Sequence, residues 1–320
     1  MAQTPFDFLQ TSLGTDVPTE PIETAGATLS WEAPGILTIE PHETSHLPAA
    51  IVSVGVHGDE TVPIRLVDRW LRGLVETGYA VRRPLLVLLA NPAAVQAESR
   101  FVEHNMNRLF SVTAAQGEYE ENRRARSLMR AVQWFVERYP DGLHFDLHST
   151  IKPSDCDRFA LVPPNCAERN LTNLMKWFQR FAVDAWVQNR SAAPTFASYS
   201  ASLGYLSATL ELGQVSSPNE PLDRFLPLLP ELDRLAQGPS MPSGHQTQGY
   251  QVLREIIRPE GAFEVCLEGF VNFRSLTAGT VIARSETEEW TVEQTGDALL
   301  FLNENVPVGH RVALVIRPMT

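Results

Sequence analysis

Short apolar segments alternate with amphipathic helical patterns between residues 49 and 236, and this alternation limits the fold more than any other feature. The segment AAIVSVGV (49–56) is typical of a buried strand, and TVPIRLVDRWLRGLVETG after it is typical of an amphipathic helix. Further strands are predicted at 85–90, 143–149, 158–163, 185–188 and 206–212, and further helices at 118–138, 168–182 and 221–236. The pattern predicts an α/β fold with a mainly parallel or mixed sheet flanked by helices.

The composition changes near residue 240. The segment AQGPSMPSGHQTQG (236–249) is rich in Gly, Pro, Ser and Gln, as expected of a linker. Beyond it come six short β-branched segments separated by turn residues: YQVLREIIRP, FEVCLEG, TVIARS, EWTVEQ, ALLFLN and RVALVIRP. We therefore predict two domains, residues 1–240 and residues 241–320, the second a smaller β sandwich or barrel.

Charge and cysteine content exclude several classes of function. The chain carries 26 basic and 38 acidic residues and no basic run, which argues against nucleic acid and anionic membranes as partners. It begins without a basic or apolar leader, and its apolar runs are too short to span a bilayer, so we expect a cytoplasmic protein. Three cysteines without a CxxC argue against disulfides and against a cysteine zinc site. A bound metal would therefore take His and carboxylate ligands, and the sequence leaves a homo-oligomer open.

Two predicted strands end at residues that can bind a metal. His57 and Glu60 follow the first strand, and His148 ends the strand in HFDLHS, so these side chains would meet at the carboxyl edge of the sheet. Two His and one Glu leave the fourth position of zinc open, as in catalytic zinc sites. For His57 and Glu60 alone, the alternative is a surface His beside a helix-capping acid.

Two further acids lie in apolar strands. Asp146 faces the same side of its strand as His148 and could orient a ligand, or serve as an ordinary buried acceptor. Glu211, in ATLELG, needs a partner if it is buried. Desolvation would raise its pKa and suit it to proton transfer, whereas on an edge strand it would simply face solvent.

A long loop follows the second strand. Residues 91–110 include Arg100, Asn107 and Arg108, and loops of this length in compact domains are often functional. Arginine can stabilise an oxyanion or bind a carboxylate, and Asn can share either task. The alternative is that the arginines are surface residues paired with Glu98 or Glu103.

Four motifs in one order, VGVHGDET, NP...SRF...NMNRLF, HFDLHST and TLELG, resemble the succinylglutamate desuccinylase and aspartoacylase family of zinc carboxypeptidase-like hydrolases. The resemblance spans residues 45 to 215. It implies one Zn²⁺ per chain, bound by His57, Glu60 and His148, with Glu211 as general acid and base. It also implies that Arg100 polarises the scissile carbonyl and that Asn107 and Arg108 bind a substrate carboxylate. The family fold adds a C-terminal β domain that narrows access to the site.

The reaction that the resemblance implies is hydrolysis of the amide bond of N-succinyl-L-glutamate to succinate and L-glutamate, a step of arginine catabolism. The substrate would be a small anionic molecule. Alternatives are deacylation of another N-acyl amino acid such as N-acetylaspartate, a carboxypeptidase activity, or a non-catalytic ligand-binding protein on the same fold. A cysteine hydrolase built on Cys156 or Cys166 lacks any supporting motif.

Overall fold

The computed structural model describes residues 6–43, 46–167, 171–190, 193–217, 219–238 and 244–319. Six strands alternate with helices in its central part: β4 (Ala49–Val54), β5 (Leu85–Leu89), β6 (Gly142–Thr150), β7 (Phe159–Val162), β8 (Ala185–Gln188) and β9 (Leu206–Gln214). They form one mixed sheet in the order β5-β4-β6-β9-β7-β8. The predicted α/β fold with a mixed sheet flanked by helices is confirmed.

The strand register brings polar residues of three strands together. β6 runs parallel to both β4 and β9, so the carboxyl ends of all three strands lie at one edge of the sheet. In this register Ser53 lies opposite Asp146, and His148 lies opposite Glu211. Because paired residues of neighbouring strands face the same side, these four side chains share one face of the sheet.

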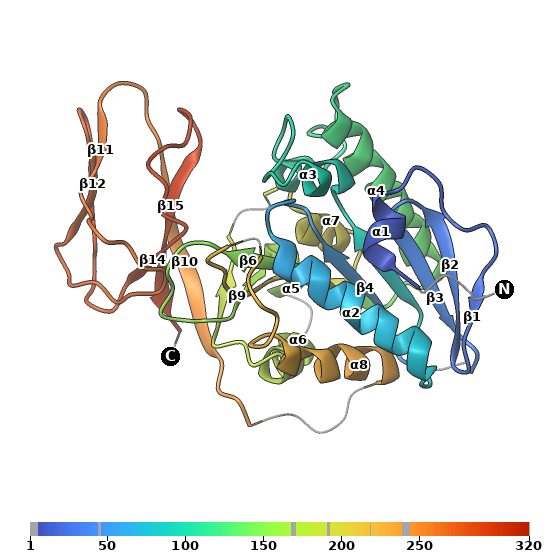
Figure 1. The fold of residues 1–320 in the computed structure, drawn as a ribbon. Coiled ribbons are helices and arrows are strands. Elements are labelled where there is room, and N and C mark those ends of the chain that lie inside the picture. Colours follow the sequence, from blue (N-terminus) through green and yellow to red (C-terminus); the bar gives the residue numbers. More distant parts are fainter. Residues whose placement is uncertain are drawn as a thin grey trace.

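Helices cover both faces of this sheet (Figure 1). On one face the core includes residues of α1 (Phe8–Leu13), α2 (Thr61–Thr77), α6 (Leu171–Arg180) and α8 (Leu229–Gln237). On the other it includes residues of α4 (Glu120–Arg138) and α7 (Phe196–Ser202). Shorter helices lie between these elements: α3 (Pro92–Gln96), α5 (Pro164–Ala167) and the 3₁₀ turns η1 (Met106–Arg108) and η2 (Leu226–Leu228).

Two sequence predictions need correction. No strand was predicted before residue 49, but the preceding segment forms β1 (Ile22–Glu23), β2 (Ala27–Ala33) and β3 (Ile36–Pro41), and β3 pairs with β5 to extend the sheet. The helix predicted at 221–236 begins later, as η2 and then α8, because Pro227 and Pro230 favour the first turn of a helix over its interior. Residues 168–170 of the helix predicted at 168–182 lie outside the described residues.

The C-terminal segments form six strands: β10 (Gln248–Ile257), β11 (Phe263–Val265), β12 (Val281–Ser285), β13 (Glu289–Thr291), β14 (Ala298–Leu300) and β15 (Arg311–Pro318). β11, β12 and β13 form a separate small sheet, whereas β10 pairs in parallel with β8 and extends the large sheet through β15 and β14. The two sheets share an apolar core that includes Ile256, Ile282 and Val312. The predicted boundary between residues 240 and 241 lies outside the described residues, and the division stays a prediction.

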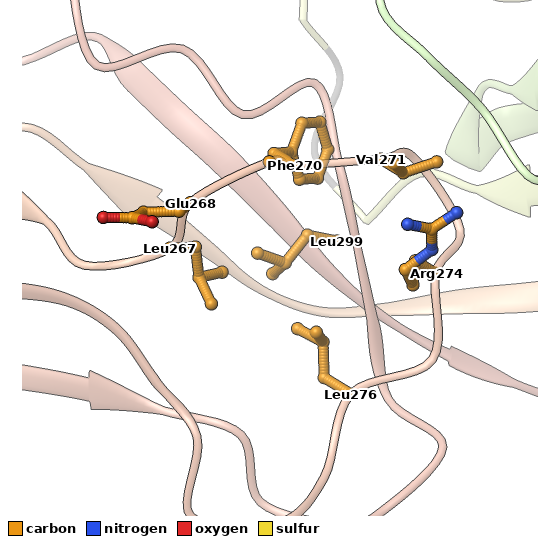
Figure 2. Close-up of a pocket in the computed structure, with 8 residues that line it drawn as sticks. Leu267, Glu268, Phe270, Val271, Arg274, Leu276 and Leu299 are labelled. Carbon is orange, nitrogen blue, oxygen red and sulfur yellow. The ribbon is translucent and has the colours of Figure 1, made fainter.

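A small pocket in this C-terminal part is lined by Leu267, Phe270, Leu276 and Leu299, with Glu268 and Arg274 beside them (Figure 2). None of these residues belongs to the central strands, so the pocket is separate from the polar sheet edge described above. Across the described ranges, no helix is long and apolar enough to cross a membrane.

Candidate metal centre and active site

His57, Glu60 and His148 meet at the carboxyl edge of the sheet, as predicted. All three are buried, and they offer ligand atoms that lie within 4.8 Å of one another. Glu60 lies between the two rings: Nδ1 of His57 is 2.7 Å from Oε1, and Nδ1 of His148 is 2.9 Å from Oε2. Glu60 is the residue before α2, but its side chain does not cap that helix. The alternative of a surface His beside a capping acid is therefore wrong.

The other nitrogen of each ring is held by a second residue. Nε2 of His57 lies 3.1 Å from Oδ1 of Asn105, an atom that also accepts the backbone N–H of Asn107 and must therefore be the amide oxygen. Nε2 of His148 lies 2.9 Å from Oδ2 of Asp146. Both partners are acceptors, so each ring donates from Nε2 and turns Nδ1 toward Glu60. Asp146 is thus an orienting acceptor of the kind that accompanies metal-binding His.

Charge balance keeps Glu60 ionised in this buried position. Burial alone would raise its pKa, but the two neighbouring His residues hold the pKa of Glu60 well below its usual range. Nη1 of Arg100 and the backbone N–H of Ser149 also donate to this carboxylate, each at 3.1 Å. Burial would likewise lower the pKa of His148, yet Asp146 and Glu60 raise it well above the usual value. The negative charges of Glu60 and Asp146 therefore stabilise a positive charge at this position, and the same charges would favour a bound cation.

The turn that carries His57 depends on glycine. A Cβ on Gly58 would lie 2.1 Å from the backbone carbonyl carbon of Ala94 in α3. The Gly58 N–H also donates to the backbone oxygen of Arg100 at 3.3 Å. The 91–110 loop is thus packed directly onto the turn that carries His57, and Gly58 permits the contact.

Glu211 lies beside this cluster on β9. That strand is central, between β6 and β7, and the Glu211 side chain is 8% exposed, so the edge-strand alternative is wrong. Its Oε2 has no hydrogen-bond partner among the described residues. Burial and the charge of Glu60 raise the pKa of Glu211 to about 7, although His148 and Arg100 act in the opposite direction. A carboxyl group of this kind can both accept and donate a proton near neutral pH.

The loop residues occupy different surroundings. Arg100 contacts Glu60 rather than Glu98 or Glu103, and its side chain stays 46% exposed. Asn107 is buried, and its Oδ1 accepts the backbone N–H of Phe196 at the start of α7, which leaves the amide NH₂ as the group able to donate to a ligand. Arg108 ends η1 and donates to the backbone oxygen of Asn107 at 2.7 Å.

Arg108 also has neighbours that the sequence did not reveal. Burial by surrounding atoms, then the positive charges of Arg311 and Arg100, lower its pKa to about 10, while Glu255 acts in the opposite direction. Arg108 is nonetheless exposed to solvent, so it does not lie in the core. Arg311 begins β15 and Glu255 lies on β10, so the C-terminal strands contribute charges to the surroundings of Arg108. Neither residue belongs to a recognisable motif, whereas Asn105 lies within NMNRLF.

Comparison with known proteins matches both parts of the chain. Residues 46–224 match the succinylglutamate desuccinylase/aspartoacylase catalytic domain, and residues 245–319 match the AstE/AspA barrel-sandwich hybrid domain. The chain belongs to the succinylglutamate desuccinylase/aspartoacylase family.

Relatives across the family resemble the chain over almost its whole length. A succinylglutamate desuccinylase of Yersinia pestis (strain Pestoides F) is 30% identical over 311 residues, which cover 93% of this chain and 92% of the relative. The crystal structure of succinylglutamate desuccinylase from Vibrio cholerae is 28% identical with a TM-score of 0.87, covering 99% of this chain and 96% of that one. The enzyme from Vibrio parahaemolyticus is 26% identical with a TM-score of 0.85, covering 99% and 97%.

The family's site chemistry fits the residues present here. Two imidazole nitrogens and one carboxylate, all buried, form a group that could bind a metal ion. Such a set is typical of catalytic zinc sites, in which three protein ligands leave room for a further oxygen atom. The acceptors Asn105 and Asp146 already turn both rings to present the same nitrogen, Nδ1, toward Glu60.

We predict that Gly58→Ala destabilises the protein and weakens metal binding, because the new methyl group would overlap the backbone of Ala94. Overpacking of this kind typically costs about 1–3 kcal/mol. Urea unfolding and metal analysis of the purified protein would measure both effects. The matched control is Gly73→Ala on α2, where nothing lies within 4 Å of the added Cβ among the described residues, so helix propensity should make it neutral or stabilising. A Gly58→Ala protein as stable and as metal-rich as the wild type would contradict the prediction.

Proposed function

We propose that this chain hydrolyses the amide bond of N-succinyl-L-glutamate to succinate and L-glutamate, with Zn²⁺ held by His57, Glu60 and His148. The observation that carries the proposal is the position of Glu211, a buried acid directly opposite His148 in the β6–β9 pair. A proton-transfer group beside a three-ligand metal set is the minimum needed for metal-assisted hydrolysis. The family relatives named succinylglutamate desuccinylase support the choice of substrate.

The protein groups divide the proposed reaction between them. When bound, Zn²⁺ supplies Lewis acidity to the carbonyl and water oxygens. Glu211 takes the proton of the attacking water and returns it to the leaving nitrogen of glutamate, which balances the proton count. Arg100, close to Glu60 and half-exposed, donates to the carbonyl oxygen as negative charge develops there.

Substrate charge is the second part of the proposal. N-succinyl-L-glutamate carries three carboxylates, so a chain with a net charge of −12 must concentrate positive charge at the site. Arg100 and Arg311 both lie close enough to Arg108 to lower its pKa. We assign carboxylate binding to Arg108 together with the amide NH₂ of Asn107, and we add Arg311 to this set.

The C-terminal strands take part in the same proposal. We propose that residues 1–240 are the catalytic domain and that residues 241–320 narrow access to its active site. In support, Arg311 and Glu255 belong to residues 241–320, and their charges shift the pKa of Arg108. We also propose that the enzyme acts in the cytoplasm, in arginine catabolism. Three free cysteines fit a reducing compartment. Assembly as a homo-oligomer stays a prediction.

The deciding experiment compares substrates and metal states. We expect about one zinc per chain and turnover of N-succinylglutamate well above that of N-acetylaspartate, N-acetylglutamate or a dipeptide. Removal of the metal with a chelator should abolish turnover, and added Zn²⁺ should restore it. Full activity without metal would contradict the metal-dependent mechanism. A preference for N-acetylaspartate would show that the chain is a different deacylase. Metal binding without turnover of any of these substrates would favour a ligand-binding protein.

We predict that Glu211→Gln lowers kcat for N-succinylglutamate by about 10²- to 10⁴-fold, because the amide keeps the shape of the side chain but cannot accept a proton. Steady-state kinetics and metal analysis would show lost turnover with zinc retained. The matched control is Glu231→Gln, which changes an acid paired with Arg180 on the opposite face of the sheet and should leave kcat unchanged. Near-normal turnover of Glu211→Gln would remove Glu211 from its assigned role.

We predict that Arg311→Gln raises KM for N-succinylglutamate by about 10- to 150-fold with little change in kcat, because a lost charge-assisted hydrogen bond to a carboxylate is worth about 1.5–3 kcal/mol. The kinetics should be measured at constant ionic strength. Arg284→Gln is the matched control, since Arg284 is an exposed residue of the same C-terminal part that pairs with Glu289. An unchanged KM would place Arg311 outside the substrate site.

A further inference from the structure

A row of buried polar side chains continues from the metal-binding group into the protein. Beyond His148 and Asp146, Oγ of Ser53 lies 2.6 Å from Oδ1 of Asp146 and 2.8 Å from Nε2 of His144. On the other side of the His144 ring, Nδ1 lies 2.6 Å from Oγ of Ser200, which is 2.9 Å from Oγ of Ser207. Four strands and helices, β4, β6, β9 and α7, each contribute to this row.

Its setting makes the row unusual. Ser53, His144, Asp146, Ser200 and Ser207 are all 0% exposed. They lie on the face of the sheet that is covered by α4 and α7, where Phe196 packs edge-on against the His144 ring. An apolar core at these positions would satisfy packing, since buried polar groups stabilise a fold only when each has a partner. The row therefore calls for a reason beyond packing.

A count of protons fixes the direction of the hydrogen bonds. Ser53 has one hydroxyl proton, and it goes to Asp146. Ser53 can then only accept from His144, so the His144 ring carries its proton on Nε2. Burial lowers the pKa of His144 to about 4, so the ring is neutral and its Nδ1 must accept, from Ser200.

Every donor in this part of the row thus points toward Asp146. Ser200 donates to His144, His144 donates to Ser53, and Ser53 donates to Asp146, so each bond polarises the next. The Ser200–His144 contact of 2.6 Å is shorter than the contacts of Ser200 to the carbonyls of Ala197, at 3.1 Å, and Phe196, at 3.4 Å. Asp146 accepts the hydrogen bond of Ser53 at Oδ1 and that of His148 Nε2 at Oδ2. Nδ1 of His148 therefore faces Glu60.

We propose that Ser53 and His144 are positioning residues, which act through Asp146 to fix the His148 ring with Nδ1 toward the metal and so set the affinity of the site. The inference rests on the proposed function in one respect, that the site binds a metal ion. It goes beyond that function because neither residue contacts the metal ligands directly. Outer partners of ligating His residues typically change metal affinity 10- to 100-fold when they are removed.

The test compares variants that break the row with one that keeps its direction. Ser53→Ala removes the hydroxyl that donates to Asp146, and His144→Leu removes the ring that donates to Ser53. For both variants we expect zinc affinity, measured by competition with a chelator, to fall about 10- to 100-fold. His144→Gln keeps an N–H at the position of Nε2 and should stay within a few-fold of wild type. Ser12→Ala, which removes another fully buried hydroxyl from α1, is the matched control and should leave zinc affinity unchanged.

A second measurement needs no variant. Nitrogen-15 NMR of the His side chains in the wild-type protein should show His144 neutral with its proton on Nε2, both with and without zinc. A proton on Nδ1 of His144 would reverse the direction of the hydrogen bonds in the row. That result would overturn the inference even if the variants fail to fold.

The failures of the two proposals are distinguishable. Folded Ser53→Ala and His144→Leu proteins that bind zinc as tightly as wild type would overturn the positioning role and leave the proposed function intact. Wild-type protein that binds no zinc would overturn both. Equal losses in Ser12→Ala and Ser53→Ala would show a general effect of removing a buried hydroxyl and would also overturn the positioning role.

Discussion

The parallel pairing of β6 with β4 and β9 is the constraint on which the site depends. It places Ser53 opposite Asp146, and His148 opposite Glu211, through strand register alone. A shift of one residue would turn each of these side chains to the other face of the sheet. That face is occupied by the apolar core under α2, α6 and α8, so the shift would bury charge in that core and turn Val52 and Phe145 toward the polar cluster. The register that forms the core therefore also forms the site.

Three buried carboxylates lie at this edge of the sheet, and their surroundings separate their roles. Glu60 is surrounded by two His rings, Arg100 and a backbone N–H, and Asp146 accepts from His148 and Ser53. Both have a pKa below the usual range despite burial. Glu211 has an oxygen without a hydrogen-bond partner among the described residues, and its pKa is raised to about 7. Differences of this kind suit the three carboxylates to the separate roles that we propose for them, as metal ligand, orienting acceptor and proton carrier.

The sequence was sufficient to predict the central strands and the residues that end them, because burial and strand length are local properties. His57, Glu60, His148 and Glu211 could be placed at one sheet edge for that reason. The β1–β3 meander was missed although β2 alternates apolar and polar residues, the pattern of a half-buried strand, and the start of α8 was placed too early. The attachment of β10 to β8 depends on contacts between distant segments, which no local pattern encodes. The same holds for the proximity of Arg311 to Arg108, and for the row through His144.

The attachment of β10 to the large sheet bears on how the two parts of the chain work together. A linker alone would leave the C-terminal strands free to move, whereas the β8–β10 pairing fixes Arg311 and Glu255 by backbone hydrogen bonds. The proposed metal ligands and Glu211 lie at the ends of the central strands, whereas Arg100 and the groups that we assign to carboxylate binding lie on the 91–110 loop and on β15. Because these sets belong to different elements, the charge offered to a substrate can change without moving the metal-binding residues. Substrate preference in this protein is therefore expected to depend on the charged groups around Arg108, not on the buried cluster at Glu60.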